Sequence, residues 1–547
     1  MAGLSEVRRK AAVRASAVRN RVAVERDIRR VRRRHAFLRS PAGSPSRGYA
    51  LAVSLTDWPY QLKLEGMLLK ALELEGYEPV VLTSRAAAGT ARRYAGAFGC
   101  RRVLVLDDYL DGESRDVRPL LAGPLTVQRL KALEVDGAHV GRQVLSTISR
   151  NLRRGSVDLE SAEARAWLEQ LLPSVLAVRE AAERILEDLD PEIVLFNEAR
   201  YAGYGSVFDV ALLRGLNVIQ FVSGFADDAL VFKRYTLETR RFHARSLGPQ
   251  AWDEVRAGPW TESMQRELDE QFERRYAGDG ALGWQLHGWT RRRDAAELLA
   301  ELELDPAKKT AVVFSHVLWD ANLFYGEDLF EDQGEWLVET VREAAANPSV
   351  NWVVRLHPAN VWKLERGAGR GEIDEVRAIR EGVGELPPHV RLLLPESDVS
   401  AMSLFELADY ALTIRGTIGV EAPCFGVPVL TAGTGHYSGR GFTEDSASAD
   451  EYRERLRRIA EIPPLSTERT ELARRHAHAL FCRRPIRFTS FRTVAMALER
   501  SADPLALNLE PRVRSREELV RADDLRTFAH WALDRSRIDY LAPPCAE

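Results

Sequence analysis

Short apolar runs alternate with longer helical stretches through the first half of the chain. Five of these runs have the length of buried strands, at residues 50–54, 80–83, 102–106, 193–196 and 218–222. Helical periodicity predicts helices between them, at residues 61–75, 87–98, about 162–189 and 206–214. Strands that alternate with helices in this way are typical of βαβ units and indicate a parallel sheet.

The alternation stops after the first half and then restarts. Residues 235–305 are charged and helical without a strand signal, so they predict a helical insert and an interdomain connection. Beyond them, five apolar runs predict further strands, at residues 310–315, 352–356, 391–394, 410–413 and 428–430. A helix is expected at 335–346. After Asp450 the chain is expected to be helical to its end, with a proline break at Pro463 and Pro464.

Two such patterns in succession predict an α/β fold with two Rossmann-like, doubly wound domains that face a cleft. A chain of 547 residues also exceeds the size of an ordinary single core. A helical N-terminal arm, a helical insert and a helical C-terminus complete the predicted architecture. The expected segments are a basic arm at 1–45, a first Rossmann-like domain at 46–235, the insert and linker at 236–305, a second Rossmann-like domain at 306–465 and C-terminal helices at 466–547.

Composition favours a folded protein of the cytoplasm. Hydrophobic residues make up 45% of the chain and charged residues 29%, as in ordinary globular proteins. No apolar run reaches the length of a membrane-spanning helix, and the Arg-rich N-terminus lacks the apolar segment of a secretory signal. The cysteines lie far apart without a CxxC pair, which indicates a reducing compartment and argues against a zinc site; they are Cys100, Cys424, Cys482 and Cys545.

Positive charge is concentrated at the N-terminus. The net charge is −3, yet residues 1–34 contain twelve Lys and Arg against three acidic residues. This arm predicts a weak electrostatic contact with an anionic membrane surface, and so a peripheral position at the inner face of the membrane. A solvated helix face is the alternative. Nucleic acid is not an expected partner, because the arm has no aromatic residues and only a weak apolar stripe of Val13, Val18, Val22, Ile28 and Val31.

Ligand-binding residues are expected in the loops that follow the strands of the second half, because ligands bind at the carboxyl ends of parallel strands. The first of these loops is Arg355-Leu356-His357-Pro358. Arg355 can bind a phosphate as a bidentate donor, and His357 can donate a hydrogen bond or carry a proton. The alternative for His357 is a side chain that a neighbouring carbonyl satisfies.

The second loop, at residues 413–422, leads from a strand into a helix. Arg415, Gly416 and Thr417 combine a positive charge, a hydroxyl and the backbone N–H groups of a helix start, which suits a phosphate. Glu421 lies one turn further on, where its carboxylate can accept hydrogen bonds from a ribose diol. The alternative is a capped helix in which Glu421 complements the helix dipole.

The third loop, at residues 433–443, holds four glycines within nine residues. Ser438, Gly439 and Arg440 offer a hydroxyl, a backbone that a ligand can approach closely and a positive charge. A flexible surface turn is the alternative, but it would leave the nearby aromatic residues without a role. The three loops should lie at one edge of one sheet, so together they predict a site for a nucleoside monophosphate or diphosphate.

Three further acidic positions follow predicted strands. Asp320 comes after the first strand of the second half, where it can orient a substrate at the cleft or cap its own loop. Glu198 follows the strand at 193–196 and can face the cleft as a general base, or lie in solvent. Asp107 and Asp108 imitate a metal-binding pair. No metal is expected, because the second half lacks a clustered set of ligands.

Three stretches of the second half resemble the glycosyltransferases of bacterial surface and capsular polysaccharide biosynthesis. They are SHVLWDANLFYGEDLFEDQGEWL at 315–337, VVRLHP at 353–358 and IRGTIGVEAPCFGVPVLTAGTGHYSGRGFTED at 414–445. The resemblance covers about residues 310–446. A more distant one is to the Kdo and sialic acid transferases that carry a His-Pro motif and use CMP-activated sugars. The sequence before Arg355 departs from the pattern of the capsule Kdo transferases.

This resemblance implies the two-domain GT-B fold, with a nucleotide-sugar donor on the second domain and a glycan or lipid-linked saccharide acceptor on the first. No cofactor is expected, because the CMP-, UDP- or GDP-linked sugar is itself a substrate. The phosphates would then lie on Arg415, Thr417 and the loop Ser438–Arg440, and Glu421 would hold the ribose. His357 and Arg355 would offset charge on the departing phosphate, while Glu198 or another first-domain carboxylate takes the acceptor proton.

Two other functions fit the same fold. A UDP-sugar 2-epimerase shares a similar Gly/Glu helix start but acts on one nucleotide sugar without an acceptor. A non-catalytic scaffold of polysaccharide assembly would keep the fold and lose the chemistry. The basic arm and the loop at 436–443 favour transfer over epimerisation.

Overall fold

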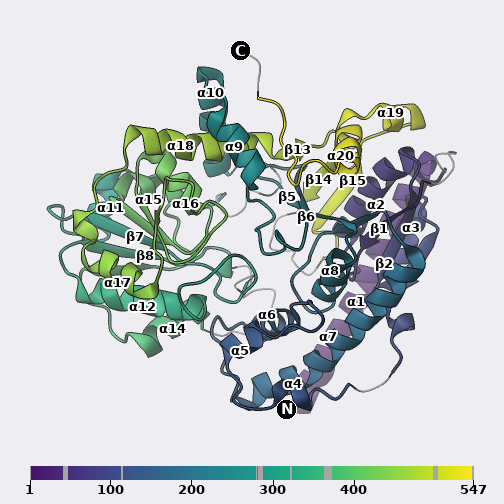
Figure 1. The fold of residues 1–547 in the computed structure, drawn as a ribbon, viewed down its shortest axis with the longest axis horizontal. Helices are drawn as coiled ribbons and strands as arrows, with labels where there is room; N and C mark the ends of the chain where they lie inside the picture. Colours follow the sequence, from purple (N-terminus) through teal and green to yellow (C-terminus); the bar gives the residue numbers. More distant parts are fainter. Residues whose placement is uncertain are drawn as a thin grey trace.

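The computed structural model describes residues 2–40, 47–112, 115–278, 280, 282, 288–320, 323–361, 372–496 and 503–544, with side chains from residue 18. The predicted boundary at 45–46 and Cys545 lie outside the described residues. Two α/β lobes stand side by side (Figure 1). Each is built on one mainly parallel sheet, which confirms the α/β fold class with two Rossmann-like domains.

Five parallel strands form most of the sheet in the first lobe. They are β1 (Tyr49–Val53), β2 (Glu78–Thr83), β3 (Arg102–Val105), β4 (Ile193–Phe196) and β5 (Asn217–Ser223). Their order, β3-β2-β1-β4-β5, is that of a doubly wound Rossmann fold. The central strands β1 and β4 are almost wholly buried, because helices cover both faces of the sheet.

Alternate residues of β1 belong to two different cores. Ala50 and Ala52 pack with α2 (Pro59–Leu74), whereas Leu51 and Val53 pack with α7 (Ala162–Leu189) and α8 (Tyr204–Leu213). This follows from the two-residue period of a strand, which sends successive side chains to opposite faces. The other helices of this lobe are α3 (Ala88–Ala97), η2 (Leu106–Tyr109), α4 (Arg118–Leu121), α5 (Val127–Lys131) and α6 (Val140–Leu152).

Two antiparallel strands that the sequence pattern did not predict extend the first sheet. β6 (Ala229–Tyr235) pairs with β5, and β13 (Pro485–Arg487) pairs with β6. Lys233 and Arg234 interrupt the apolar pattern of β6 although both are buried. Lys233 donates a hydrogen bond of 2.6 Å to Asp539, which lies 306 positions away. The charge of this strand is therefore compensated by a residue that no local pattern connects with it.

The second sheet repeats the Rossmann order. It contains β7 (Thr310–Phe314), β8 (Asn351–Arg355), β9 (Val390–Leu393), β10 (Tyr410–Thr413), β11 (Val429–Thr431) and β12 (Glu444–Asp445). These strands are all parallel and lie in the order β9-β8-β7-β10-β11-β12. The helices around it are α12 (Gln333–Ala346), α14 (Asp374–Gly382), α15 (Ala401–Leu407), α16 (Ile418–Glu421), η3 (Ala422–Phe425), α17 (Ala449–Arg457) and η4 (Ile459–Glu461).

Helices connect the two lobes. The charged region between the sheets forms α9 (Pro249–Ala257), α10 (Glu262–Ala277) and α11 (Ala295–Glu301). α18 (Thr467–His478) continues into η5 (Ala479–Arg483), and both pack against α10. Leu268 and Phe272 of α10 share a core with Val420 at the start of the second-lobe helix α16. This connection thus contacts the loop region where a ligand site was predicted.

The prediction that the chain is helical after Asp450 is wrong in its last part. β13 is followed by a hairpin of β14 (Phe491–Ala495) and β15 (Leu507–Pro511), and then by α19 (Arg516–Arg521) and α20 (Asp523–Leu533). These elements return to the first lobe, where Leu509 and Phe528 join the core that contains α2 (Figure 1). Strands this short depend on pairing with distant residues, which local periodicity does not report.

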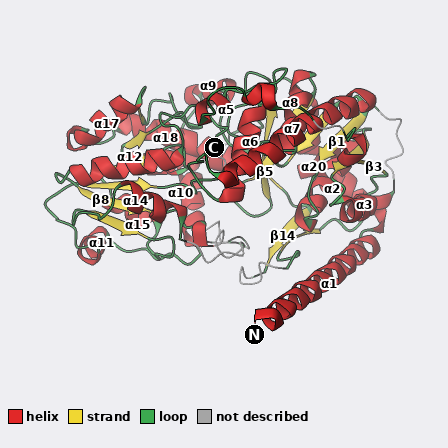
Figure 2. Ribbon diagram, turned by 90° about the horizontal axis from the view of Figure 1, so that it is seen from below, coloured by secondary structure: helices red, strands yellow, loops and turns green. Residues whose placement is uncertain are grey.

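The N-terminal helix α1 (Ala2–Arg34) projects from the first lobe, followed by η1 (Ala36–Arg39) (Figure 2). Its last part is not a separate arm, since Ile28 and Val31 are buried against the body. Asp27 pairs with Lys63 at 2.5 Å, and both side chains are only 1% exposed. The predicted arm is therefore integrated into the first lobe from about residue 24, while Arg26 and Arg29 face outward.

The two lobes contact each other across the cleft through the loop after β7. Leu323 packs into the first-lobe core around α6, and its carbonyl accepts a hydrogen bond from Arg142. Phe324 and Tyr325 pack on the guanidinium of Arg200, which is 5.1 Å from the Tyr325 ring centroid.

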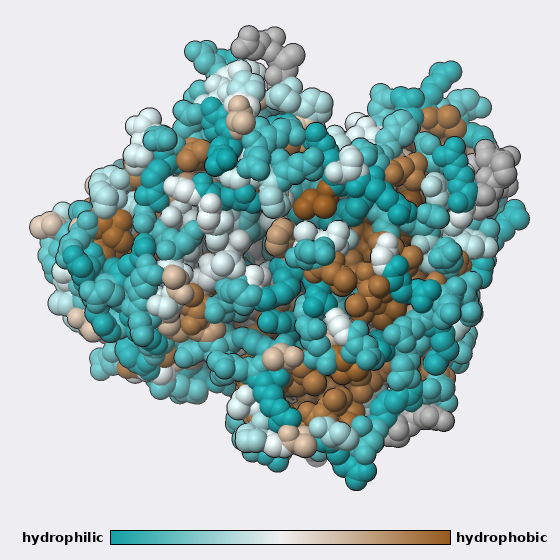
Figure 3. All heavy atoms as spheres, in the orientation of Figure 1, coloured by the Kyte–Doolittle hydropathy of each residue, from teal (hydrophilic) through white to brown (hydrophobic). Residues whose placement is uncertain are grey.

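The visible face is mostly hydrophilic, with apolar side chains gathered toward the first lobe (Figure 3). Among the described helices, none is long and apolar enough to cross a membrane.

Candidate functional site

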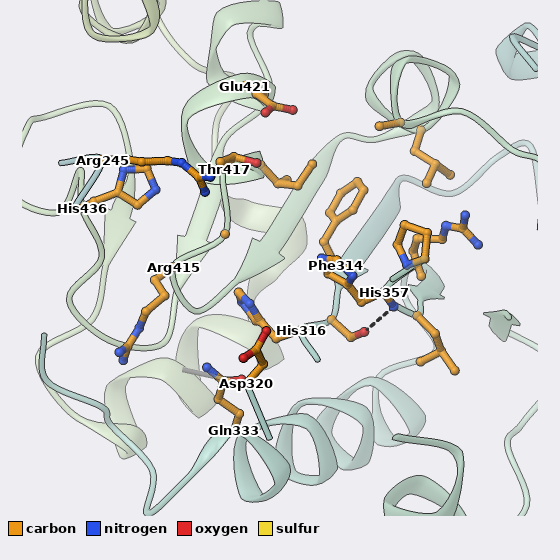
Figure 4. Close-up of a pocket in the computed structure, with 18 of the residues that line it drawn as sticks. Arg245, Phe314, His316, Asp320, Gln333, His357, Arg415, Thr417, Glu421 and His436 are labelled. Carbon is orange, nitrogen blue, oxygen red and sulfur yellow. Dashed lines mark hydrogen bonds between the residues drawn. The ribbon is translucent and has the colours of Figure 1, made fainter. Parts of the chain in front are cut away.

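A cavity of about 340 Å³ opens at the carboxyl edge of the second sheet. The chain leaves this sheet in opposite directions after β7 and β10, which are neighbours, so a crevice forms between their following loops. We call this the first cavity. Its lining includes His316, Asp320, Arg355, His357, Arg415, Gly416, Thr417 and Glu421 (Figure 4). Seven of the predicted site residues therefore meet at one place.

Two histidines occupy equivalent positions at the ends of adjacent strands. Phe314 of β7 pairs with Arg355 of β8, so His316 and His357 each follow the paired residue by two positions. The backbone N–H of His357 donates to Ser315 Oγ at 3.0 Å, which ties the two loops together (Figure 4). The parallel register thus brings two imidazoles to the same cavity, although only His357 was predicted.

Burial keeps the imidazole of His316 neutral. His316 has a pKa lowered to about 3 by desolvation, with smaller contributions from His357 and Arg415. Its Nε2 lies 3.0 Å from Thr413 Oγ1, and the side chain is held between that hydroxyl and the edge of Trp336. A bound anion would favour the protonated form of such a group. The first cavity therefore contains a neutral imidazole, and an anion bound beside it would raise its affinity for a proton.

The loop after β10 forms the opposite wall. Gly416 and Thr417 line the cavity, and a Cβ on Gly416 would come within 3.3 Å of the His316 ring. Within the described residues, the backbone N–H groups of Thr417 and Ile418 have no acceptor in this chain. The helix that follows, α16, is only one turn long before η3 begins. The predicted binding loop is present, but the α-helix that follows it is so short that its dipole is small.

Glu421 is more deeply enclosed than the sequence indicated. Its side chain is 1% exposed and pairs with Arg275 at 3.0 Å, while Tyr276 donates to its other oxygen. Both partners come from α10, in the region between the two sheets. A carboxylate offers about four acceptor positions, so two remain for a ligand hydroxyl. Glu421 lines the cavity with its orientation already determined by these two residues.

The two predicted phosphate-binding arginines are engaged by the protein. Arg355 donates to the carbonyl oxygens of Leu394 and Ser397. Arg415 pairs with Asp328 and is turned away from Thr417 (Figure 4). Burial lowers the pKa of each guanidinium to about 10, so both remain charged at neutral pH. They contribute positive charge to the first cavity, but the terminal nitrogens of each already donate to protein oxygens and are not available to bind a phosphate through two parallel hydrogen bonds.

The glycine-rich loop lines a different space. Ser438, Gly439 and Arg440 border a cavity of about 400 Å³, which we call the second cavity. The two cavities share a wall of four residues, namely His243, Tyr325, Arg415 and His436. The loop also supports the first cavity, because Tyr437 packs so closely on Gly419 that a Cβ there would lie 2.0 Å from its hydroxyl.

The acidic candidates occupy distinct positions. Asp320 lines the first cavity and accepts a hydrogen bond of 2.9 Å from the first-lobe residue Tyr201. Glu198 is not among the described residues that line either cavity. Its carboxylate accepts the backbone N–H groups of Ala199 and Arg200, and desolvation raises its pKa. Asp107 and Asp108 are also outside both cavities, and Arg85 binds both of them.

Several lining residues were not among the predicted site residues. They include His316, His243, His436, Arg245, Arg275 and Tyr325. His316 could have been found, because its place after β7 repeats that of His357 after β8. His436 lies within the glycine-rich loop but was not assigned a role there. His243 and Arg245 come from a first-lobe segment without any recognisable pattern, and only the packing of the two lobes brings them to the cavity.

The two sheets, each in Rossmann order and joined across a cleft, define a GT-B fold. A family described as capsule polysaccharide biosynthesis protein matches residues 275–472. This segment holds the second sheet and the first-cavity loops, and it includes the stretch at 310–446. The match confirms the resemblance to capsule polysaccharide biosynthesis proteins.

Similar solved structures are also found, whereas no curated protein matches the chain. The chain is similar to a β-Kdo 2,7-transferase, KpsC of Thermosulfurimonas dismutans, with 15% identity over 60% of this chain and 89% of that one and a TM-score of 0.32. It is also similar to the UDP-GlcNAc 2-epimerase of Neisseria meningitidis, with 11% identity, coverage of 79% and 95% and a TM-score of 0.26. A third is the calicheamicin glycosyltransferase CalG4, with 14% identity, coverage of 79% and 94% and a TM-score of 0.26.

Proposed function

We propose that this protein is a glycosyltransferase of capsule polysaccharide synthesis, which moves a sugar from a nucleotide-activated donor to a glycan or glycolipid acceptor. One observation carries the proposal. His316, His357 and Thr417 line one cavity at the point where the second sheet changes direction, and positively charged guanidinium groups surround them. Such an arrangement suits a ligand whose negative charge increases during reaction, as the phosphate of a departing nucleotide does.

The donor nucleotide is placed in the first cavity in this proposal. The backbone at Thr417 and the imidazoles of His316 and His357 receive the phosphate that leaves. Glu421, held by Arg275 and Tyr276, accepts hydrogen bonds from the ribose hydroxyls. Because burial holds the His316 pKa near 3, its imidazole is neutral before the ligand binds and gains affinity for a proton as the phosphate becomes more negative.

The acceptor hydroxyl needs a base, and Asp320 is the stronger candidate. It lines the first cavity and is oriented by the Tyr201 hydroxyl of the opposite lobe, so it lies where donor and acceptor would meet. Glu198, which the sequence predicted as the base, instead accepts backbone N–H groups of its own loop. We therefore assign proton removal to Asp320 and a supporting role in the loop after β4 to Glu198.

We further propose that transfer requires no divalent metal. Guanidinium and imidazole groups in the first cavity can offset the leaving charge. Among the described residues, the group with metal-ligand geometry is Glu267, His478 and Cys482, which lies outside both cavities. Activity that is lost in a chelator and restored by manganese or magnesium would contradict this part.

We also propose that α1 contacts an anionic membrane surface. Arg19, Arg26, Arg29 and Arg33 are exposed on the side of the helix opposite to Ile28, which is buried against the body. A row of arginines on an outward face is attracted to anionic lipids, and this attraction weakens as salt rises. The protein would then act at the inner face of the membrane, where a lipid-linked acceptor is available.

The function is tested by incubating the full-length protein with a panel of CMP-, UDP- and GDP-sugars, with and without a lipid-linked saccharide acceptor. Release of nucleotide that depends on the acceptor, together with a lengthened acceptor detected by mass spectrometry, is the expected result. Conversion of the sugar without any acceptor would instead identify an epimerase. Binding of neither donor nor acceptor would overturn the enzymatic proposal.

A further inference from the structure

The second cavity has no role in the chemistry assigned above. It lies between the lobes, with Arg241, Phe242 and Ser246 on the first-lobe side and the glycine-rich loop on the other. It adjoins the first cavity through the shared wall that contains His243 and His436. These two rings stack with centroids 5.2 Å apart and an interplanar angle of 28°. A ligand that extends from one cavity to the other would pass along this wall.

Two buried polar atoms in the shared wall, Arg415 Nε and His436 Nδ1, lack a hydrogen-bond partner among the described residues. His436 is 8% exposed, and its Nδ1 has no hydrogen-bond partner among the described residues. Burial lowers its pKa to about 3, so the ring is neutral and carries one N–H donor and one acceptor nitrogen. Buried polar atoms are nearly always satisfied in folded proteins. This nitrogen therefore points to a ligand group at the boundary of the two cavities.

The guanidinium groups around the second cavity already bind other groups of the protein, two of them carboxylates. Arg241 pairs with Glu327, and Arg415 pairs with Asp328. Arg440 donates to the carbonyl of Leu247 and lies over the Trp252 ring. A phosphate entering this space would have to compete with these interactions. The first cavity, which has backbone N–H groups and imidazoles available, is the better anion site.

The remaining lining matches a sugar ring. Phe242 is 36% exposed and presents an aromatic face, while its backbone is held by Thr239 and Tyr235. Hydroxyls and backbone carbonyls of Ser246, Gly433, Gly435, Ser438 and Gly439 line the rest of the cavity. The N–H groups of Gly435 and Gly439 already donate to Ser438 Oγ and Asp445, so the Ser438 hydroxyl and the carbonyls are the groups that can bind a ligand. A saccharide needs both properties, because its ring has apolar C–H faces and a rim of hydroxyls. An aromatic face with convergent polar groups is how binding sites orient such ligands.

The glycines of the loop are required for this shape. Gly433 lies so close to the backbone of Glu327 that a Cβ would come within 2.6 Å of its carbonyl oxygen. Gly439 has a φ of +71°, in the left-handed region that favours glycine. Asp445 holds the loop by accepting the Gly439 N–H at 2.7 Å and the Thr443 hydroxyl at 2.8 Å. The loop is therefore an ordered wall and not a loose surface turn.

We propose that the second cavity is a saccharide subsite, in which a pyranose ring packs on Phe242 and hydrogen-bonds to the Ser438 loop and to His436. This inference rests on the proposed function, and it reassigns Ser438, Gly439 and Arg440 from the donor phosphates to a sugar. The ring belongs either to the glycosyl group of the donor or to the terminal unit of the acceptor. Both have the same chemistry, so the experiment below separates the two sources.

The test compares Phe242→Ala with Phe242→Tyr, which keeps the aromatic face. Leu237→Ala is the matched control, because Leu237 is 41% exposed on the same segment but lies outside both cavities. Saturation-transfer NMR would measure the binding of methyl glycosides of glucose, galactose, N-acetylglucosamine and glucuronic acid without any nucleotide. We expect at least one of these glycosides to bind the wild type. Its affinity should fall about tenfold in Phe242→Ala and stay unchanged in Phe242→Tyr and Leu237→Ala. If none binds the wild type, the inference is overturned.

Calorimetry with intact protein then identifies the source of the sugar. Titrations would use CMP, UMP and GMP, the corresponding nucleotide sugars, and the acceptor. A tenfold loss for a nucleotide sugar but not for its nucleoside phosphate assigns the subsite to the donor, and a loss confined to the acceptor assigns it to the acceptor. Weakened binding of the nucleoside phosphates themselves would overturn the inference. Because glycoside binding needs no turnover, this result is independent of whether transfer is detected.

Discussion

The two lobes have the same strand order but present different chemistry at the carboxyl edges of their sheets. The second sheet brings two imidazoles, His316 and His357, to one cavity, which guanidinium and carboxylate groups also line. Carboxyl and hydroxyl groups lie near the carboxyl edge of the first sheet, where Glu198 and Tyr201 follow β4 and Glu65 of α2 lies beside the end of β1. The same fold can therefore present different chemical groups at the carboxyl edge of its sheet, because the strands determine where a loop lies but not which side chains it carries.

Burial acts on the two edges with opposite signs. It lowers the pKa of imidazoles in the second lobe, to about 3 for His316 and His436. In the first lobe it raises the pKa of carboxyls, to about 8 for Glu65. Both edges are therefore less charged than their composition indicates. We interpret the second edge as the part that binds the nucleotide, and the first as the part that orders the opposite side of the cleft.

The largest effect on turnover is expected from Asp320, which lies in the first cavity and accepts a hydrogen bond from Tyr201 of the first lobe. Asp320→Asn removes the proposed base while it retains a hydrogen bond to Tyr201, so kcat should fall by about 10²–10⁴-fold with little change in donor affinity. Glu198→Gln is the comparison, and we expect it to change kcat by less than about tenfold because Glu198 lines neither cavity. Initial rates at saturating donor and acceptor measure both. Equal losses in the two variants would contradict the assignment of the base.

The next prediction tests the pair of imidazoles. His316→Ala and His357→Ala should each lower kcat by about 10²-fold, because each removes a group that stabilises charge developing on the leaving phosphate. Donor KM should change much less. His389→Ala is a suitable control, since His389 lies outside both cavities and contacts the Ala344 carbonyl. A folded His357→Ala protein with wild-type turnover at saturating substrates would refute the proposed role.

Glu421 should affect binding more than turnover. Glu421→Gln keeps the side-chain shape but weakens its hydrogen bonds to the ribose, so we expect donor KM to rise by roughly tenfold with kcat nearly unchanged. Alanine is less informative here, because it removes both oxygens that Arg275 and Tyr276 bind, whereas glutamine retains one acceptor for these buried donors. Steady-state kinetics with varied donor measure the effect. A fall in kcat at unchanged KM would mean that Glu421 acts on the reacting atoms.

The two edges should also differ in how pH changes their stability. At pH below 6.5 the unfolded chain protonates its histidines, whereas His436 stays neutral in the folded protein down to about pH 3. Stability is therefore lost as pH falls through this window, by about 1.4 kcal/mol per pH unit for each such group. We expect His436→Gln to reduce the pH dependence of the apparent melting temperature between pH 7 and 5. An unchanged dependence would show that His436 is protonated in the folded state.

The first edge should respond in the opposite direction. Glu65 keeps its proton in the folded state up to about pH 8, while the unfolded chain loses it above about pH 4.5. Stability is therefore lost as pH rises between these values. Glu65→Gln cannot ionise and retains an acceptor oxygen for the Gln61 side-chain amide, so it should raise the apparent melting temperature at pH 8 more than at pH 5. A larger gain at pH 5 would contradict this account.

The smallest effect is expected from the N-terminal helix, which the second lobe lacks. Deletion of residues 1–17 should leave turnover of a soluble acceptor within about twofold, and should reduce binding to anionic vesicles most strongly at low salt. Deletion of residues 1–34 is different, because it removes Asp27 and leaves the buried Lys63 unpaired, which costs about 3–5 kcal/mol. Vesicle sedimentation and thermal melting measure the two effects. Wild-type stability after the longer deletion would refute the integration of α1 into the first lobe.

Local sequence pattern was sufficient for most of the two sheets. The strands at 193–196 and 410–413 match β4 and β10 in both bounds, because both are short, fully buried apolar runs. The loop that contains His357 and the loop that contains Gly416 and Thr417 were located for the same reason, since each follows such a strand. The resemblance over 310–446, which the match at 275–472 confirms, rests on these loops and their spacing.

The elements that sequence analysis missed depend on distant partners. β6 contains Lys233 and Arg234, so its pattern does not indicate a buried strand, and only the approach of Asp539 makes that burial favourable. The short strands β13, β14 and β15 are likewise stabilised by pairing and not by periodicity. The same limit applied to α1, whose integration depends on the pairing of Asp27 with Lys63.

The sequence by itself determined which second-lobe loops lie at the carboxyl edge of the sheet, because the position of a loop after a buried strand is a local property. Only the tertiary structure decided which residues of those loops meet in the first cavity and which line the second. It brought His316 beside His357 through the register of β7 and β8, and Asp320 to Tyr201 through the contact of the lobes. It also separated Ser438 and Arg440 from the first cavity, since His243 and His436 meet between them. Such contacts join residues far apart in the chain, and their geometry arises only when both lobes are packed.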